Sequence, residues 1–290
     1  MRSFLFVPGD SPKKLDKAMG SGADALLLDL EDSISPQGKA QARATTAAFL
    51  KDATAAKDRP RLYVRINGIA TGLTDDDLDA VVAARPDGIM LPKAEGGAAV
   101  THCDAKITAR EAIHNIDEGR IDIIAIATET AQAIFLAGTY GGASKRLKGL
   151  TWGAEDLSVE LGAEANRDRD GRFLAPYQLA RSLCLAGAAA AQVQAIDTVY
   201  VDFRNEAGLR RECEEARRDG FTAKMAIHPA QVAVINAVFT PTAEALKQAE
   251  AVLAAFAQNP DAGTVGIGGV MYDRPHLERA RQLLARAKRS

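Results

Sequence analysis

The fold is decided by the stretch Ile121-Asp-Ile-Ile-Ala-Ile-Ala-Thr-Glu129, a short aliphatic run that ends in an acidic residue. A similar run, Leu150-Thr-Trp-Gly-Ala-Glu-Asp156, follows it and also ends in carboxylates. Each run is typical of a buried parallel strand, because it is short, aliphatic and followed by helix-forming sequence. Two parallel strands with acidic ends predict that Glu129 and Asp156 point into one small volume.

Strand-like and helix-like segments alternate outward from these runs. The predicted strands number eight: Phe4–Val7, Ala25–Leu30, Leu62–Ile66, Gly88–Leu91, Ile123–Thr128, Gly149–Trp152, Thr198–Val201 and Lys224–Ile227. Helical patterns between them include Pro12–Met19, Lys39–Ala53 and Glu206–Arg218. Eight such units favour an α/β fold of the TIM (β/α)8 barrel type, which typically spans about 250 residues. A doubly wound open sheet is the rival, but no Gly-x-Gly-x-x-Gly follows the first predicted strand.

The pattern changes after the eighth predicted strand. A helix is expected over Thr242–Gln258, then a Gly-rich connector that begins at Asn259, then a basic helix over Pro275–Lys288. Glycine-rich sequence between helices predicts a hinge or an extended crossover. We therefore expect residues 1–240 to form the barrel and residues 241–290 a C-terminal helical extension.

Composition excludes several classes of protein. The 290 residues are 47% hydrophobic and 26% charged, with a formal net charge of −2. These values predict a globular protein with a substantial core and give no sign of nucleic-acid or membrane binding. The three cysteines, Cys103, Cys184 and Cys213, have no close spacing, which predicts reduced thiols and a cytoplasmic location.

Most predicted strands end in polar residues. These are Asp29, Glu31 and Asp32, then Arg65 and Asn67, Lys93, Glu129, Glu155 and Asp156, Asp202, and His228. The carboxyl ends of barrel strands build the active site in this fold, so the set predicts one site at that end. Strand alternation predicts that only one of Glu155 and Asp156 faces the barrel axis.

Glu129 and Asp156 are the candidate metal ligands. Two carboxylates directed at one volume repel unless a cation or a proton lies between them. Oxygen ligands without nearby His or Cys favour Mg²⁺, with Mn²⁺ possible, and waters or substrate oxygens would complete the shell. The alternative is that either residue caps a helix or forms a salt bridge.

Arg65 lies inside an otherwise apolar run and needs anionic partners. Those partners are either a carboxylate such as Asp29 or a substrate oxygen. Lys13, Lys14 and Lys17 follow the first predicted strand, where a helix N-terminus and lysines can hold phosphate. For any single one of these lysines, a solvated helix face is the better explanation. His228 is either a positioned polar group or a structural histidine.

Taken together, the motifs resemble a known family. They are Arg2-Ser-Phe-Leu-Phe-Val-Pro-Gly, Leu28-Asp-Leu-Glu-Asp, Val64-Arg-Ile-Asn, Leu91-Pro-Lys, Glu129-Thr, Gly153-Ala-Glu-Asp-Leu and Lys224-Met-Ala-Ile-His-Pro-Ala-Gln. In order and nearly end to end, they resemble the citrate lyase beta-subunit-like family, with the HpcH/HpaI aldolases and the malyl-CoA and citramalyl-CoA lyases. The tail Gly269-Val-Met-Tyr-Asp-Arg-Pro resembles that family's Gly-x-Met-Ile-Asp-x-Pro, with Tyr272 in place of Ile.

The resemblance implies a TIM barrel, usually trimeric, that binds Mg²⁺ through Glu129 and Asp156. It implies that Arg65 contacts the substrate carbonyl, and that Asp273 reaches a neighbouring subunit's site as catalytic acid/base on a C-terminal lid. The resemblance favours Lys13, Lys14 and Lys17 as CoA ligands. We expect Arg65, Asp29 and Glu129 among the substrate-binding residues. The implied activity is reversible carbon–carbon cleavage of a 3-hydroxyacyl-CoA such as malyl-CoA or citramalyl-CoA into acetyl-CoA or propionyl-CoA and a 2-oxo acid, glyoxylate or pyruvate. The alternatives are a malyl-CoA thioesterase, a citrate lyase beta subunit acting on an acyl-carrier-protein thioester, and a non-catalytic acyl-CoA-binding barrel; the oligomer is a homotrimer or a hexamer.

Overall fold

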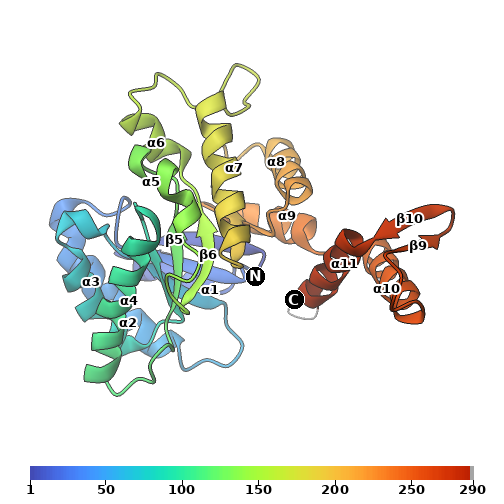
Figure 1. The fold of residues 1–290 in the computed structure, drawn as a ribbon. Helices are drawn as coiled ribbons and strands as arrows, with labels where there is room; N and C mark the ends of the chain where they lie inside the picture. The colour runs from blue at the N-terminus through green and yellow to red at the C-terminus, as the bar shows by residue number, and fades with distance from the viewer. Residues whose placement is uncertain (288–290) are drawn as a thin grey trace.

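Eight parallel strands close into a barrel in the computed structural model, which describes residues 1–287 (Figure 1). The strands are β1 (Ser3–Pro8), β2 (Ala25–Asp29), β3 (Arg61–Arg65), β4 (Gly88–Leu91), β5 (Asp122–Ile126), β6 (Leu147–Thr151), β7 (Gln194–Asp197) and β8 (Ala223–Ala226). Neighbours in sequence are neighbours in the sheet, and β1 pairs with both β2 and β8. The predicted TIM barrel is confirmed.

Helices surround the barrel. They are α1 (Pro12–Met19), α2 (Lys39–Ala53), α3 (Thr74–Val81), α4 (Gly96–Ile113), α5 (Ala131–Leu136), α6 (Ala154–Glu160), α7 (Ala175–Ala190), α8 (Glu206–Asp219) and α9 (Pro229–Phe239). The predictions of α1 and α2 are confirmed at both ends. Proline at the first position of α1 explains its sharp start, since the fixed φ suits a helix and the missing N–H is not needed there.

Two layers of apolar side chains form the core. Alternation along β2 shows how they arise: Leu27 points into the barrel and Leu26 and Leu28 point toward the helices. The barrel interior is filled by a small cluster that includes Phe4, Leu27 and Tyr63. The interior is therefore packed, and any binding site has to lie at an end of the barrel. All three cysteines are buried and unpaired.

The seventh strand differs from its prediction. We predicted Thr198–Val201, but β7 spans Gln194–Asp197, and Asp202 is an exposed residue of the following turn. The buried acidic residue is Asp197, because it pairs inside the protein: its carboxylate accepts hydrogen bonds from Lys224 Nζ at 2.7 Å and Trp152 Nε1 at 2.9 Å. A strand that ends on a buried charge is not recognisable from its hydrophobic pattern.

Loss of Lys224 is expected to destabilise the protein. Lys224 is fully buried, and its ammonium bonds Asp197 and Glu212 at 2.7 and 2.8 Å. Lys224→Met leaves the Asp197 carboxylate in the core with a single cationic neighbour, Arg181. Removing one partner of a buried pair costs about 3–5 kcal/mol, and we expect the lower end of this range because Arg181 remains.

Urea unfolding measures this loss directly. Arg210→Ala is the control, because its contact with Glu206 is an exposed pair along one helix. Such pairs contribute about 0.5 kcal/mol or less. A Lys224→Met loss as small as that of the control would refute a structural role for the buried pair.

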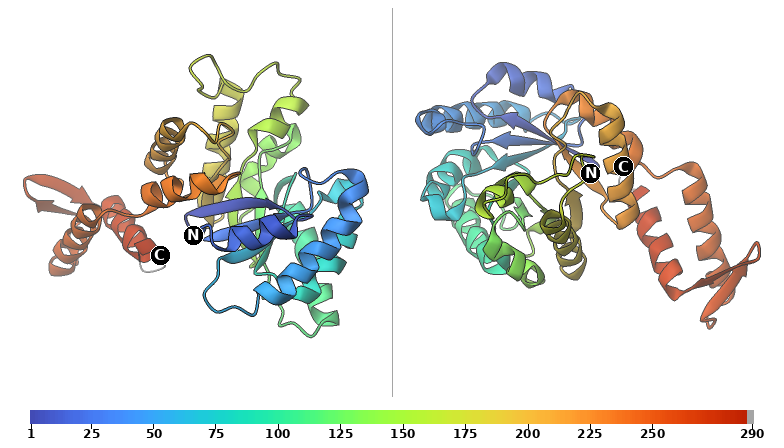
Figure 2. Two further views of the ribbon diagram at one scale, coloured as in Figure 1. Left: turned by 180° about the vertical axis from the view of Figure 1, so that it is seen from behind. Right: turned by 90° about the horizontal axis from the view of Figure 1, so that it is seen from above.

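The C-terminal extension has a core of its own. It comprises α10 (Ala243–Gln258), β9 (Thr264–Ile267), β10 (Val270–Asp273) and α11 (Arg274–Ala287), and it projects away from the barrel in each view (Figure 2). Phe256 of α10, Val265 of β9 and Leu277 of α11 belong to an apolar cluster separate from the barrel core. Lys288, where the predicted last helix ends, lies outside the described residues.

The Gly-rich connector, predicted as a hinge or an extended crossover, contains a hairpin that the sequence analysis did not predict. Its second half forms an antiparallel hairpin in which Ile267 pairs with Val270. Gly268 and Gly269 make the turn with φ of 59° and 82°, values that glycine adopts without steric cost. Across residues 1–287, no helix has the length and apolarity to cross a membrane.

Candidate active site

Charged side chains gather at the carboxyl ends of the barrel strands. Asp29 and Arg65 are the last residues of β2 and β3, Lys93 follows β4, and Glu129 follows β5. Asp156 lies in the first turn of α6, directly after β6. Five consecutive units of the barrel therefore contribute to one polar cluster at this end of the barrel.

Arg65 is held by three carboxylates. Its Nε and Nη2 donate to the two oxygens of Asp29, both at 2.7 Å, in a bidentate pair. Its Nη1 lies 2.9 Å from Glu31 and 3.2 Å from Asp32. The guanidinium also lies 4.8 Å from the centre of the Phe6 ring. Arg65 therefore has a fixed orientation, and Nη2 retains a second N–H for another partner.

Asp29 serves Arg65 and the backbone. Burial by itself raises the pKa of Asp29, but the hydrogen bonds from Arg65, Ser33 and Glu31 outweigh burial and lower it. Both carboxylate oxygens are engaged, one with the amide of Glu31 and the other with that of Ser33 as well as Arg65. Asp29 is thus saturated by the protein, and its predicted contact with substrate stays a prediction.

Lys93 connects the two halves of the cluster. Its ammonium lies 2.7 Å from Glu31 and 3.1 Å from Asp156, and its backbone N–H donates to Glu129 Oε2 at 2.6 Å. Burial opposes its charged form, yet the hydrogen bond to Glu31 and the charges of Glu129 and Asp156 raise the pKa of Lys93. Its φ of 49° is left-handed, a conformation that costs energy in a non-glycine residue and is often found at functional sites.

Glu129 is a buried carboxyl that repels its neighbours. It is 2% exposed, and burial followed by the charges of Asp156 and Glu31 raises its pKa to about 8. Gly153 allows it this position, because a Cβ there would lie 3.2 Å from Glu129 Cγ and Oε1. Thr130, not Glu129, caps α5. The capping alternative for Glu129 is therefore wrong.

Asp156 belongs to the cluster, but it lies on a helix and not at the end of a strand as predicted. Strand alternation was expected to separate it from Glu155, but both residues are helical and lie in the first turn of α6. Successive residues of a helix point about 100° apart, so only Asp156 contacts Lys93, while Glu155 accepts a hydrogen bond from Asn166 at 2.9 Å. Only one of the two faces the cluster, for a different reason.

The residues suit a hard divalent cation. Across the described residues, no group of three or more His, Cys, Asp and Glu side chains has the spacing of a metal site. Two carboxylates are sufficient for Mg²⁺, which usually keeps several waters and shares its shell with substrate oxygens. Burial, followed by the charges of Asp156 and Glu31, raises the pKa of Glu129, and a bound cation would favour its ionised form.

Sequence comparison identifies the family of this chain. The HpcH/HpaI aldolase/citrate lyase model matches residues 2–229, and a second, described as a C–C bond lyase of the TIM-barrel fold, matches residues 173–289. The chain belongs to the HpcH/HpaI aldolase/citrate lyase family. The resemblance drawn from the motifs is confirmed, and with it the class of enzyme, a carbon–carbon lyase.

Relatives in this family carry different activities. A (3S)-malyl-CoA thioesterase of Cereibacter sphaeroides is 35% identical over 99% of this chain and 94% of its own length. Citramalyl-CoA lyase of Rattus norvegicus mitochondria is 32% identical over 99% of this chain and 86% of its own. The citrate lyase beta subunit of Leuconostoc mesenteroides is 33% identical over 98% and 92%.

Solved structures agree with the family. Protein CitE from Mycobacterium tuberculosis, in complex with magnesium, acetoacetate and coenzyme A, superposes with a TM-score of 0.76 at 32% identity and covers 99% of this chain and 98% of its own. The same protein with magnesium and pyruvate gives 0.70 at 29% identity, covering 98% and 97%. The citrate lyase family fold therefore extends over both the barrel and the extension.

The sequence analysis also predicted site residues on α1, before α9 and in the C-terminal extension. Lys13 and Lys17 are exposed on α1. His228 caps α9 by accepting from Ala230 N at 3.2 Å and stacks on Phe203, which favours the structural alternative. Asp273 ends β10 in the extension, so one subunit by itself does not bring it to Glu129 and Asp156 (Figure 1).

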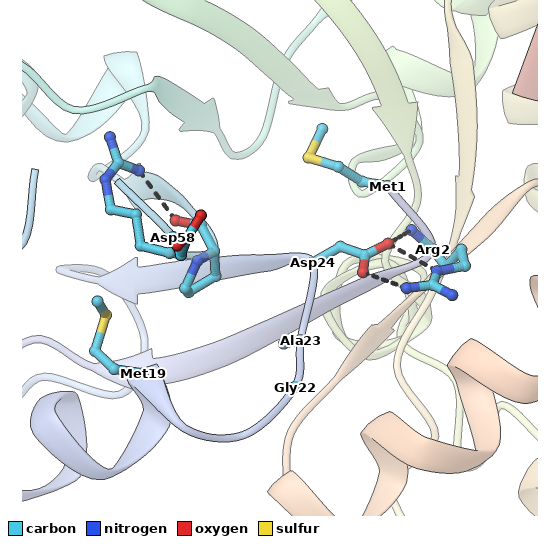
Figure 3. A pocket seen from close by; sticks show the side chains of 9 residues that line it. Met1, Arg2, Met19, Gly22, Ala23, Asp24 and Asp58 are labelled. Carbon is cyan, nitrogen blue, oxygen red and sulfur yellow. Dashed lines mark hydrogen bonds and ion pairs between the residues drawn. The ribbon is translucent and has the colours of Figure 1, made fainter. Parts of the chain in front are cut away.

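The opposite end of the barrel carries structural contacts. A hollow of about 400 Å³ lies where β1, β2 and β3 begin, and Figure 3 shows the Arg2–Asp24 ion pair at its rim. A larger cavity of about 1100 Å³ lies nearby, lined by Met1 and Arg61 and by Arg286 of α11. The N-terminal face of a barrel is generally its stability face, so we place no chemistry here.

Proposed function

We propose that this chain is a Mg²⁺-dependent lyase that reversibly cleaves a 3-hydroxyacyl-CoA such as malyl-CoA or citramalyl-CoA. The products are acetyl-CoA or propionyl-CoA and a 2-oxo acid, glyoxylate or pyruvate. The observation that carries the proposal is the buried Glu129, which interacts with Asp156 and Lys93 in the cluster that also contains Arg65. Protein CitE from Mycobacterium tuberculosis, which is seen with magnesium, acetoacetate and coenzyme A and with magnesium and pyruvate, supports it.

Glu129 and Asp156 hold the divalent ion in this proposal. Bound there, Mg²⁺ supplies Lewis acidity and orients the hydroxyl and carboxylate oxygens of the oxo-acid half. Arg65 places its remaining N–H at the thioester oxygen, where negative charge develops as the C–C bond electrons form an enolate. Bidentate pairing with Asp29 fixes that donor before the substrate arrives, so no reorganisation is needed during the reaction.

The acid/base group comes from a second subunit in a homotrimer or hexamer. Residues 241–290 act as the lid, and Asp273 of one copy protonates the enolate carbon in the site of the next. The lid has its own apolar core and can therefore move as a unit against the barrel. Lys13 and Lys14 in the first turn of α1 and Lys17 in its last turn are exposed and accessible to CoA phosphates.

Product analysis tests the proposal. Purified protein with Mg²⁺ is given malyl-CoA, citramalyl-CoA and β-methylmalyl-CoA, and oxo acid, acyl-CoA and free CoA are measured. Glyoxylate or pyruvate in equal amount to acetyl-CoA or propionyl-CoA is the expected result. Free CoA without a shorter acyl-CoA would instead show hydrolysis, which the 35% identical malyl-CoA thioesterase makes the second candidate.

Turnover only of a thioester on acyl-carrier protein would point to the third candidate, a citrate lyase beta subunit. The 33% identical citrate lyase beta subunit of Leuconostoc mesenteroides supports that candidate. If no thioester is turned over, the remaining candidate is a barrel that binds acyl-CoA without catalysis.

Mg²⁺ affinity is expected to rise with pH. Burial and the charge of Asp156 raise the pKa of Glu129 to about 8, so below this pH a proton competes with the ion for the carboxylate. The apparent affinity should rise roughly tenfold for each pH unit below about 8 and then level off. Calorimetry in buffers of different ionisation enthalpy should also detect about one proton released per ion.

Glu129→Gln is the control for this titration, because it removes the competing proton together with the ligand charge. It should bind Mg²⁺ weakly and lose the dependence on pH that Glu129 confers. Affinity of the unmodified protein that is constant between about pH 6 and pH 8 would contradict the assignment of Glu129 as a ligand.

A further inference from the structure

Asp273 and His276 form a close pair at the start of α11. Asp273 is the last residue of β10, and His276 lies in the first turn of the helix that follows. Their side chains approach to 2.5 Å between His276 Nδ1 and Asp273 Oδ1. Two weaker contacts of 3.3 Å run between each side chain and the other residue's backbone N–H.

The short contact requires a proton between the two atoms. Two bare acceptors, a carboxylate oxygen and an imidazole nitrogen, would repel each other at 2.5 Å. With a proton on Nδ1, the contact becomes a charge-assisted hydrogen bond to the carboxylate. Without that proton, Nδ1 would accept from the backbone N–H of Asp273, but this N···N distance is longer, at 3.3 Å. The geometry therefore favours imidazole as the donor to the carboxylate.

Neighbouring groups hold the pair without neutralising it. The Tyr272 ring meets the His276 ring edge-on at 5.4 Å, and Gln248 of α10 donates to the Tyr272 hydroxyl at 2.7 Å. Arg274 is directed elsewhere, to Pro260 O and toward the Phe256 ring. Within residues 1–287, the hydrogen bond from His276 is the main interaction that lowers the pKa of the Asp273 carboxyl. Both side chains are about 40% exposed and accessible to a substrate.

We propose that His276 stores the proton that Asp273 delivers, which makes the two residues a proton-sharing pair. This inference rests on the proposed function of Asp273. In cleavage, the substrate hydroxyl loses its proton to solvent as its carbon becomes a carbonyl, and the C–C bond electrons form an enolate. An imidazolium at His276 passes its Nδ1 proton to the Asp273 carboxylate, which delivers that proton to the enolate carbon. The neutral imidazole then regains a proton from solvent, so one proton leaves the substrate and one enters it. In condensation the same proton moves in the reverse direction.

A carboxyl without this partner is a poor acid at neutral pH. An ordinary aspartate, with a pKa of about 3.9, is protonated in roughly one molecule per thousand at pH 7. The hydrogen bond from His276 lowers the pKa of Asp273 further. An imidazole has two ring nitrogens that can each carry a proton, so it can give one to a carboxylate and keep the other.

Helix capping is the competing explanation for His276. The two backbone contacts have the pattern of a capping box, in which the third helical residue bonds back to the cap. Glutamine is a common third helical residue in capping boxes, so it preserves the cap. Its amide cannot act as an acid, so it cannot supply a proton to Asp273. His276→Gln therefore separates the two roles, and His102→Gln on the exposed face of α4 is a matched control.

The test measures cleavage by the full-length Mg²⁺-loaded variants as a function of pH, with Asp273→Asn for reference. We expect His276→Gln to keep its melting temperature and KM, to lose kcat by roughly 10²-fold, and to lose the ionisation that limits kcat near neutral pH. His102→Gln should behave as the unmodified protein. If Asp273→Asn is inactive and His276→Gln is fully active with an unchanged pH profile, His276 is a cap only.

An NMR measurement keeps the inference testable without turnover. In the unmodified full-length protein at pH 7, the ¹⁵N signal of His276 Nδ1 should report a bound proton, and Asp273→Asn should shift it toward the unprotonated form. A ¹⁵N shift typical of an unprotonated Nδ1, or a shift that Asp273→Asn does not change, would contradict the proton-sharing pair, whichever thioester the enzyme cleaves. If no thioester is cleaved but the NMR result is as expected, the proposed function fails and the proton-sharing pair stands.

Discussion

Glu129→Gln will lower cleavage of the preferred acyl-CoA by at least about 10³-fold, the largest loss that we expect from one substitution. The side chain is nearly isosteric, so its pocket beside Gly153 stays filled. What it removes is the charge that holds the divalent ion. An ion that polarises the reacting oxygens supplies several kcal/mol of transition-state stabilisation, and about 4 kcal/mol corresponds to a factor of roughly 10³.

Glu155→Gln is the matched control for this experiment. Glu155 lies next to Asp156 on α6, but it is exposed and bonds Asn166. We expect that variant to retain kcat within about twofold. Comparable losses from both substitutions, or an active Glu129→Gln enzyme that still requires Mg²⁺, would show that the metal is held elsewhere.

Arg65→Ala is expected to reduce kcat by roughly 10²–10³-fold, the usual effect of removing one donor to a developing oxyanion. Arg65→Lys should recover little of it, because an ammonium cannot reproduce the bidentate pair with Asp29. Mg²⁺ affinity serves as the control for folding. An inactive variant that still binds Mg²⁺ normally lacks only the Arg65 N–H donor. An inactive variant that no longer binds Mg²⁺ has a disrupted active site.

Mixing two inactive variants tests whether the site is shared between subunits. Arg65→Ala and Asp273→Ala homo-oligomers should each be inactive, and after subunit exchange some sites would combine an intact barrel from one chain with an intact lid from another. Partial recovery of activity is the expected result. If exchange is verified and no activity returns, Asp273 does not act in a neighbouring subunit's site.

The barrel could be predicted from sequence because each unit carries a local signal. Short aliphatic runs separated by helical patterns predicted the number of units and the position of seven strands, and several of these strands are followed by the polar residues of the cluster. The prediction of the seventh strand was wrong because Asp197 is buried by its ion pair with Lys224 on the next strand. That contact joins residues far apart in the sequence. The hairpin around Gly268 was not predicted, because two four-residue strands that pair with each other are too short to show a clear hydrophobic alternation.

The charges inside the site were harder to predict than its members. Sequence pointed to Arg65 and Glu129, but it left open whether Arg65 meets protein or substrate, and it gave Lys93 no partner. Lys93 bonds side chains from two other barrel units and adopts a left-handed backbone, features set by the assembled barrel. His276 went unnoticed because its spacing suggested no metal, although three residues after Asp273 is the spacing at which helical side chains meet.

Cleavage in D₂O tests the central claim most directly. The protein, Mg²⁺ and malyl-CoA are mixed in D₂O, and the products are identified by NMR and mass spectrometry. We predict glyoxylate and an equal amount of acetyl-CoA that carries at least one deuteron in its methyl group, because the enolate carbon takes its proton from a group in exchange with solvent. Malate and free CoA without deuterium at carbon would contradict carbon–carbon cleavage and show that the same site hydrolyses the thioester.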